Sequence, residues 1–355
     1  MTDVRAWILV LAATAVAATC PEIARAAPQT VAEIATYAGA DRQAVLEAGA
    51  TREGELQLYQ IGTQSEPILQ AFGRKYPFLR VLPYRGDSVT VARRVQEEYK
   101  AGRYVVDAFE LDRAGLRTIL EVGYLQPFKS PELAAFRDIA KEPGGHWAND
   151  YESYVGLGYN TKMVSEADRP KSYDDLLDPK WTGKMAVPGT TTLANFVGAL
   201  LKEKDEAFLK RLGAQKIRVY EITGRAVANL VVAGEVPLSP AIFNSHMANS
   251  RDQGASVDWR AIGGVYSTTG AVALPTRSAH PHAAMLYIDF MLSREGQVMM
   301  QKIGYASART DLDNREKPER IYYLGDEPDY ARNYEKWSTL GRQYIGRGET
   351  PPAKN

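Results

Sequence analysis

The sequence predicts an α/β protein built from two α/β lobes that are joined by crossover strands. Short apolar strand patterns alternate with helical patterns, which is typical of βαβ units and a mainly parallel sheet. This alternation begins near residue 55 and begins again near residue 184. No Gly/Ser-rich linker separates the two stretches, so strands that cross between the lobes are the simplest connection.

Length and charge agree with this organisation and exclude some partners. The chain has 355 residues, of which 45% are hydrophobic, and at about 150 residues per domain this suggests two domains. The 43 Lys and Arg residues balance the 43 Asp and Glu residues. Without a net positive field, neither nucleic acid nor an anionic membrane is an expected partner.

The N-terminus has the pattern of a secretory signal peptide. Residues 6–20 are apolar and uncharged, and Ala24-Arg25-Ala26 forms an A-x-A cleavage site. As a helix this stretch would span roughly 22 Å, too short for a bilayer core of about 30 Å. Cleavage after residue 26 would remove Cys20, the chain's one cysteine, and leave 355 − 26 = 329 residues without a disulfide or a thiolate metal site. A lipoprotein anchored at Cys20 is the alternative, although Thr19 is an unusual neighbour for that processing.

The first lobe repeats the pattern of strand, polar loop and helix. We expect strands at 55–61, 79–84 and 104–108, and helices at 66–76 and 89–101. The loops between them contain Gly62, Thr63 and Gln64, and then Arg85, Gly86, Asp87 and Ser88.

The second lobe repeats it again. We expect strands at 184–187, 218–222 and 236–238, and helices at 193–202 and 226–233, with Thr190, Thr191, Thr192, Thr223 and Arg225 in the loops. Residues 155–160 and 270–274 are the candidate crossover strands. A helix at 283–303 and a Tyr-rich segment at 321–345 would return to the first lobe.

The motifs of common enzymes are missing from the sequence. It contains no G-x-S-x-G, H-E-x-x-H or Walker motif, and Gly156-Leu157-Gly158 has Thr161 where a dinucleotide fingerprint needs its third glycine. His280-Pro281-His282 is more typical of a solvated turn than of a metal site. We therefore expect a binding protein without a metal or cofactor, and not an enzyme.

The polar loops predict an anion-binding site instead. Each precedes an expected helix, and helix N-termini offer unpaired N–H groups and a partial positive charge. Arg85 and Arg225 would add planar bidentate donors from opposite lobes. The alternative for each loop is that its Ser, Thr or Asp simply caps the helix.

Three segments resemble a known family. Residues 159–164, 170–188 (PKSYDDLLDPKWTGKMAVP) and 283–297 (AAMLYIDFMLSREGQ) resemble the extracellular solute-binding proteins of bacterial ABC importers. They are most similar to the cluster that includes ferric-iron, thiamine, polyamine, sugar-phosphate and phosphonate binders. The resemblance covers roughly residues 50 to 310.

The resemblance implies a type II periplasmic-binding-protein fold, with a ligand cleft between the lobes. It also implies a periplasmic, monomeric receptor that closes on a small-molecule ligand and delivers it to an ABC permease in the inner membrane. On this basis residues 1–26 are the signal peptide, residues 27–154 and 270–355 form lobe 1, and residues 155–269 form lobe 2.

Ferric iron is the nearest alternative ligand. The resemblance implies that iron binders hold the metal with an adjacent Tyr pair, but the matching position here is Phe243-Asn244-Ser245-His246. Fe(III) prefers anionic oxygen donors, for which Asn, Ser and neutral His are poor substitutes. Tyr154, Tyr159 and Tyr266 remain as phenolates for a different arrangement, although each is also typical of a packed strand aromatic.

We therefore expect a receptor for a small organic anion that carries a carboxylate, phosphonate or phosphate. Arg85, Ser88, Thr191 and Thr192 would hold the anion and Arg225 would close over it, while Tyr59 and Tyr266 flank the organic part and Asp87 or Asp112 receives any amine. The full set of expected contacts is Tyr59, Thr63, Gln64, Arg85, Gly86, Asp87, Ser88, Asp112, Tyr154, Thr190, Thr191, Thr192, Arg225, Asn244, Tyr266 and Ser267. A periplasmic sensor partner and an enzyme are further alternatives.

Overall fold

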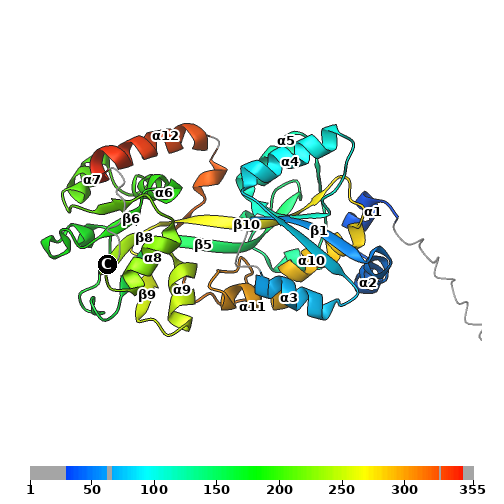
Figure 1. Ribbon diagram of the computed structural model, residues 1–355, viewed down its shortest axis with the longest axis horizontal. Coiled ribbons are helices and arrows are strands. Elements are labelled where there is room, and N and C mark those ends of the chain that lie inside the picture. Colours follow the sequence, from blue (N-terminus) through cyan, green and yellow to red (C-terminus); the bar gives the residue numbers. More distant parts are fainter. Residues whose placement is uncertain (1–28, 62–65, 328, 347–355) are drawn as a thin grey trace, which may run out of the picture.

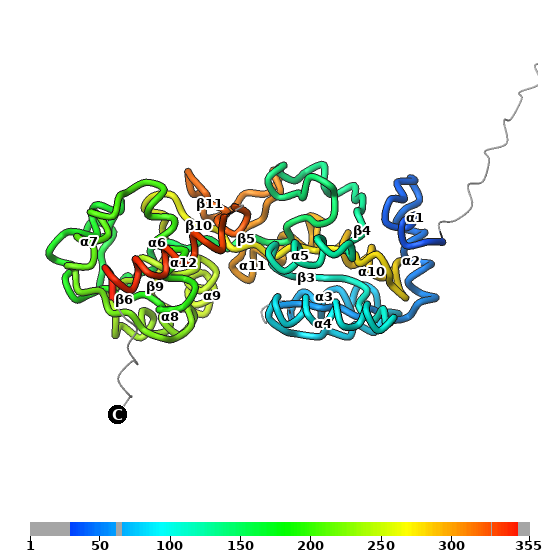
Figure 2. Tube along the Cα trace, turned by 90° about the horizontal axis from the view of Figure 1, so that it is seen from above, coloured from blue at the N-terminus to red at the C-terminus, as the bar shows by residue number. Residues whose placement is uncertain are grey.

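The computed structural model describes residues 29–61, 66–327 and 329–346. Two α/β lobes lie side by side, and two long strands, β5 (Trp147–Asn160) and β10 (Val265–Pro275), run from one to the other (Figures 1 and 2). The predicted two-lobed α/β fold is confirmed. The expected signal peptide and its cleavage site lie outside the described residues.

The first lobe is built around three parallel strands. β1 (Glu55–Gln60) lies between β2 (Arg80–Arg85) and β3 (Ala108–Asp112), and the helices α3 (Glu66–Lys75), α4 (Ser88–Lys100) and α5 (Arg113–Glu121) follow these strands. The third strand was predicted at 104–108 and begins only at Ala108. The reason is burial, because Tyr104 and Val105 are 42% and 39% exposed whereas residues 108–111 are fully buried.

The sheet is mixed, and the prediction of a mainly parallel sheet is wrong. Its central order is β2-β1-β3-β10-β5-β8. β10 is antiparallel to both β3 and β5, and β5 is antiparallel to β8 (Leu238–Phe243) and β9 (Val257–Arg260). One crossover strand leaves the first lobe and the other returns to it, so the two run in opposite directions between the lobes.

The second lobe has the two strands predicted at 184–187 and 218–222, and its two predicted helices begin two residues earlier, so Thr191, Thr192 and Arg225 lie in first turns and not in loops. The strand predicted at 236–238 is β8 (Leu238–Phe243), which begins only at Leu238. β6 (Ala186–Pro188) and β7 (Arg218–Tyr220) pair in parallel. The helices of this lobe are α6 (Thr191–Leu200), α7 (Glu206–Gly213), α8 (Gly224–Val232) and α9 (Asn244–Asp252).

The predicted helix at 283–303 is two helices, α10 (Pro281–Leu292) and α11 (Arg294–Lys302). The break is at Ser293, whose hydroxyl accepts a hydrogen bond from the Gly296 amide (3.1 Å) and so caps a new helix. α10 packs against α2 (Arg42–Glu53), where Arg42 and Asp289 form a buried ion pair of 2.7 Å.

The C-terminal segment packs on the second lobe. In α12 (Tyr330–Leu340), Trp337 and Leu340 join the same buried cluster as α6, and a methyl group at Gly198 of α6 would lie 2.7 Å from the Trp337 ring. Figure 1 shows α12 above α6. This differs from the expectation that residues 321–345 return to the first lobe, because the large apolar face of α6 offers the better packing partner.

The remaining elements are short. They are α1 (Val31–Thr36), β4 (Leu125–Gln126), β11 (Ile321–Tyr322), the 3-10 turns at Pro131–Ala135, Asp138–Ala140, Asp174–Leu177, Pro179–Trp181 and Leu324–Asp326, and a π turn at Gly341–Ile345. Within the described ranges, no helix combines the length and apolar character needed to cross a membrane.

Each lobe has its own buried core. Along β5 the buried side chains pass from the first core to the second between Tyr151 and Tyr154, and along β10 they do so between Ala271 and Tyr266. Residues 151–154 and 266–271, with the residues directly next to them, therefore form the junction between the lobes.

Candidate functional site

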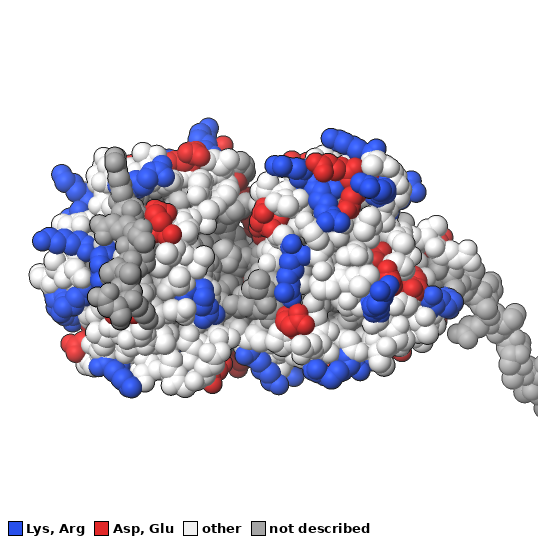
Figure 3. Space-filling model, in the orientation of Figure 1, with Lys and Arg blue, Asp and Glu red and all other residues white. Residues whose placement is uncertain are grey.

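A cleft separates the two lobes, and charged side chains of both signs flank it (Figure 3). A cavity of about 270 Å³ lies between them beside β10. Asp112 and Arg113 line it from the first lobe, Thr191 and Asn195 from the second, and Tyr266 and Ser267 from β10. The structure thus brings together four of the expected contacts: Asp112, Thr191, Tyr266 and Ser267. A larger cavity of about 910 Å³, between α2, α3 and α10, lies outside the cleft and contains none of them.

On the first lobe, the acidic residues cap helices. The Asp87 carboxylate accepts a hydrogen bond from the Thr90 amide (2.9 Å), and these contacts with Thr90 lower its pKa. The Asp112 carboxylate accepts one from the Gly115 amide (2.8 Å). Both therefore follow the capping alternative. Asp112 also lines the cavity between the lobes, whereas Asp87 does not. Of these two caps, only Asp112 could therefore also contact a solute there.

Ser88 lies where the first turns of α4 and α5 meet. A methyl group at Gly115 would lie 2.6 Å from the Ser88 Cβ, so the two turns approach this closely only because residue 115 is glycine. The Ser88 hydroxyl is buried and has no hydrogen-bond partner among the described residues. Gly86, just before α4, packs against Val91.

On the second lobe, the start of α6 is free of a side-chain cap. Thr190 is the N-cap residue, but its hydroxyl contacts Thr192 (3.4 Å) instead of a backbone amide. By contrast, Thr223 caps α8 through the Ala226 amide (3.2 Å). In this lobe α9 also begins without a side-chain cap, so α6 and α9 both retain N–H groups that could meet an anion.

Arg225 of the second lobe does not line the cavity of about 270 Å³, and it forms no ion pair with a carboxylate of the described residues. It is half-buried in the first turn of α8, and one of its N–H groups donates to the main-chain carbonyl of His246 (3.1 Å). Burial lowers the pKa of its guanidinium, and the Tyr305 phenol faces it. No ion pair formed by the described residues includes Arg225. Its charge is therefore desolvated without being neutralised.

Arg85 is different, because its charge is already compensated. It is exposed at the end of β2 and forms an ion pair of 2.8 Å with Glu66 at the start of α3. The equal roles expected for Arg85 and Arg225 are therefore not reflected in the structure.

Three expected contacts are held in packing instead. Tyr59 is fully buried, where its hydroxyl donates to Glu98 (2.7 Å) and accepts from Arg94 (2.9 Å). Asn244 accepts from the Tyr154 amide (2.8 Å), and the Tyr154 hydroxyl donates to Glu152 (2.8 Å). Burial raises the pKa of both tyrosines, which disfavours phenolates. We therefore remove Tyr59, Tyr154 and Asn244 from the proposed contacts. Thr63 and Gln64 lie outside the described residues.

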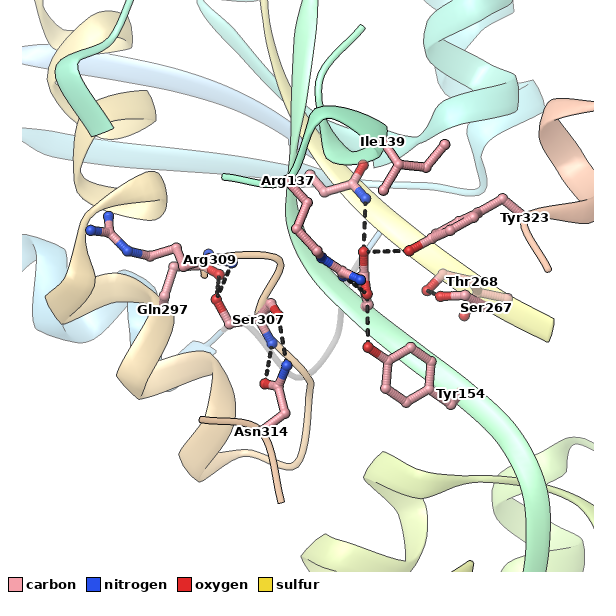
Figure 4. Close-up of polar contacts among 12 residues, drawn as sticks. Arg137, Ile139, Tyr154, Ser267, Thr268, Gln297, Ser307, Arg309, Asn314 and Tyr323 are labelled. Atoms are coloured by element: carbon pink, nitrogen blue, oxygen red, sulfur yellow. Dashed lines mark hydrogen bonds and ion pairs between the residues drawn. The ribbon is translucent and has the colours of Figure 1, made fainter. Parts of the chain in front are cut away.

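A hydrogen-bonded carboxylate fixes the junction of the lobes. The fully buried carboxylate of Glu152 bonds to the Arg137 guanidinium at 2.6 Å and to the Tyr154 and Tyr323 hydroxyls at 2.8 and 2.9 Å. Figure 4 shows these three side chains pointing toward one another. Arg137 comes from the first lobe and Tyr323 from the C-terminal segment. Glu152 therefore joins three parts of the chain at the crossover.

A second group of buried residues at the junction was missed by sequence reasoning. Glu110 on β3 and Asp150 on β5 have no exposed surface, and the Tyr151 and Tyr305 rings stack beside them with centroids 4.2 Å apart. Burial raises the pKa of Asp150 to about 7. The available signal was the run of polar residues at 149–153, inside a strand that is buried along its whole length.

Comparison with known proteins agrees with the two-lobed fold and the cavity between the lobes. Residues 111–327, which are more than half of the chain, match the family described as bacterial extracellular solute-binding protein. An uncharacterised protein of Haemophilus influenzae is 26% identical over 272 residues, which cover 72% of this chain and 78% of that protein.

Solved structures share the fold. Iron-bound HitA from Pseudomonas aeruginosa has a TM-score of 0.64 at 22% identity, with 82% of this chain and 99% of that chain covered. AfuA from Actinobacillus pleuropneumoniae, with fructose-6-phosphate bound, has a TM-score of 0.57 at 22% identity, with 82% and 96% covered. Ferric iron-binding protein A from Mannheimia haemolytica has a TM-score of 0.62 at 15% identity, with 82% and 98% covered. With its two lobes, its crossover strands and this family match, the chain belongs to the bacterial extracellular solute-binding proteins, the periplasmic receptors of ABC importers.

Proposed function

We propose that the solute of this receptor is a small organic anion with a carboxylate, phosphonate or phosphate group. The main support for the proposal is that the Arg225 guanidinium is half-buried and forms no ion pair among the described residues. A guanidinium that has lost part of its hydration and faces no carboxylate is stabilised when an anion binds it. Other arginines near the cleft are already paired, Arg113 with Asp326 and Arg251 with Asp258.

The start of α6 supplies the second part of the proposed site. Its uncapped N–H groups and the positive end of its dipole favour the same sign of charge as Arg225 does. Thr191 lines the cavity opposite Asp112, so a solute there would touch both lobes. Closure of the lobes would exclude water and strengthen these charge-assisted contacts.

Ferric iron is the second candidate, because several of the similar solved structures are iron-binding proteins, although AfuA holds fructose-6-phosphate. The described residues offer no group of three or more His, Cys, Asp or Glu side chains that could hold a metal. At the position where the family resemblance implies a Tyr pair, the Asn244 and Ser245 side chains contact the Ser153 hydroxyl at 3.2 and 3.1 Å. The comparisons leave both ligands open, and the environment of Arg225 is the reason that we propose the organic anion first.

Calorimetric titration of the chain from residue 27 with fructose-6-phosphate, phosphonates, carboxylates, polyamines, thiamine and ferric citrate tests the proposal. We expect binding of an anionic organic solute, and we expect Arg225→Ala to weaken it by at least about tenfold. The basis is that a hydrogen bond to a charged group contributes about 1.5–3 kcal/mol.

Arg218→Ala is the matched control. Arg218 is also half-buried in the second lobe, and it contacts the Tyr220 hydroxyl and the Glu235 carbonyl at the opposite end of β7 from the cleft. Its replacement should leave the affinity unchanged. Equal affinity of Arg225→Ala and wild type would contradict the assigned role. Binding of ferric citrate alone, with visible absorbance from a phenolate-to-iron transition, would favour the iron receptor.

A further inference from the structure

Asp150 occupies a β-bulge at the junction of the lobes. In the pairing of β5 with β10, Tyr151 lies opposite Gly270 and Asn149 lies opposite Ala271, so Asp150 is an extra residue without a partner. A bulge redirects the side chain of the strand that contains it. A methyl group at Gly270 would lie 2.7 Å from Asp150 Oδ1 and 2.1 Å from the Tyr151 ring. Both side chains therefore lie over the same glycine, although consecutive strand residues normally point to opposite faces.

The Asp150 carboxyl is enclosed and unsatisfied. It has no exposed surface, and neither of its oxygens forms a hydrogen bond of normal geometry with a described residue. Burial raises its pKa and has the largest effect, although the backbone amides of Asp150 and Tyr151 lie near enough to lower it in part. No lysine or arginine of the described chain forms an ion pair with it. An isolated carboxylate in such a place is costly, and one remedy is to carry a proton.

The neighbouring groups are mostly acidic or phenolic. Glu110 faces Asp150 from β3, with Tyr151 beside it on β5, Tyr287 on α10 and Tyr305 after α11. Burial raises the pKa values of these neighbours, and charged groups further away also act on them. The charge of Arg85 opposes the rise in the pKa of Glu110, that of Asp112 adds to the rise for Tyr151, and that of Arg225 opposes the rise for Tyr305. The two cations thus act on the neighbours of Asp150 and not on Asp150 itself. Two neighbouring buried carboxyls of this kind cannot both ionise without a large cost.

We propose that Asp150 and Glu110 form a buried proton-binding site at the junction of the lobes, and that the pair holds at least one proton at neutral pH. The site lies where β5 passes from the first core to the second, so loss of the proton would place an uncompensated negative charge at the junction. The protonated carboxyl can also donate a hydrogen bond to an oxygen that otherwise has no partner. The proposal does not depend on the identity of the solute.

Thermal unfolding of the solute-free protein between about pH 4.5 and pH 8 tests this site. Burial raises the folded-state pKa of Asp150 to about 7, whereas an unfolded Asp loses its proton near pH 3.9. The proton therefore stabilises the fold fully below about pH 4, and this contribution is lost as the pH rises through 7. Asp150→Asn has no proton to lose. We expect its Tm to approach or exceed that of wild type at about pH 8 and the difference, variant minus wild type, to rise by several degrees from about pH 4.5 to pH 8.

Asp107→Asn is the control for replacing a buried aspartate. Asp107 is also fully buried in the first lobe, but its oxygens accept from the Gln57 amide and the Ser278 hydroxyl, both at 2.8 Å, and it pairs with the His280 ring nitrogen at 2.8 Å. This variant should have a lower Tm than wild type at both ends of the pH range.

Two results would overturn the proposal. One is a Tm difference between Asp150→Asn and wild type that does not change with pH. The other is measured on wild type alone and needs no folded variant: an infrared spectrum at neutral pH without the C=O stretching band of a protonated carboxylic acid.

Discussion

Two buried acidic residues of β5, only two positions apart, differ in whether neighbouring side chains compensate their charge. Glu152 and Asp150 are both fully buried. Glu152 receives hydrogen bonds from Arg137, Tyr154 and Tyr323, so its charge is compensated. Asp150 has no such partner within the described residues. Glu152 thus connects parts of the chain at the junction of the lobes, whereas Asp150 belongs to the proposed proton site.

Replacing Glu152 tests the first of these roles. Glu152→Gln keeps the shape but removes the charge that pairs with Arg137, whose side chain is 35% exposed. We expect the free energy of unfolding to fall by about 1.5–3 kcal/mol, as for other hydrogen bonds to charged groups. Urea unfolding measures it. The exposed pair Lys317 and Asp313 supplies the control, since Asp313→Asn should change stability by less than about 0.5 kcal/mol. Equal effects of the two variants would show that the Glu152 contacts are not stabilising.

Among the elements, helix starts were predicted well and their roles less well. Asp87 and Thr223 stand at helix N-termini, as the sequence indicates, and Asp112 stands at the start of α5, a helix that was not predicted; all three bond to backbone amides. Thr190 stands in the same kind of position without such a bond. A local pattern identifies the cap position, but whether the cap side chain turns toward the backbone depends on what packs around it.

The bulged pairing of β5 with β10 leads to a prediction about glycine. A side chain at Gly270 would collide with the Tyr151 ring and with Asp150, so we expect Gly270→Ala to lower stability by about 1–3 kcal/mol through overpacking. Gly73, inside α3, has open space around its Cα. Gly73→Ala should therefore raise stability by about 0.5–1 kcal/mol. Denaturant unfolding of both variants measures the contrast, and a neutral Gly270→Ala would show that the bulge is easily rearranged.

Over the whole molecule, the proposed proton site and the proposed anion site are linked through Tyr305. Burial raises the pKa of its phenol, the charges of Glu110 and Asp150 add to the rise, and the charge of Arg225 of the second lobe opposes it. A negative charge that appears at Asp150 would reduce the attraction of this region for an anion. By linkage, anion binding and proton binding should then favour one another.

The affinity for an anionic solute should therefore fall as the pH rises from about 6 to 8. The reason is that burial raises the pKa of Asp150 to about 7. We expect roughly a two- to fivefold loss in wild type relative to Asp150→Asn, which corresponds to about 0.4–1 kcal/mol. Titration calorimetry of both proteins with the same solute removes the solute's own ionisation from the comparison. Parallel pH profiles would refute the link while leaving both sites standing.

The sequence by itself determined the kind and order of most elements, the two lobes, the crossover strands and the family. These follow from local information, because apolar periodicity and turn residues act over a few neighbouring positions. The tertiary structure decided the rest: the mixed sheet, the place of α12 on the second lobe, the division of the polar loops between capping and the cleft, and the buried acids Glu110 and Asp150. Each of these depends on contacts between residues far apart in the chain, as when Gly270 makes room for Tyr151 and Asp150. Such contacts cannot be predicted from the local pattern of apolar and polar residues.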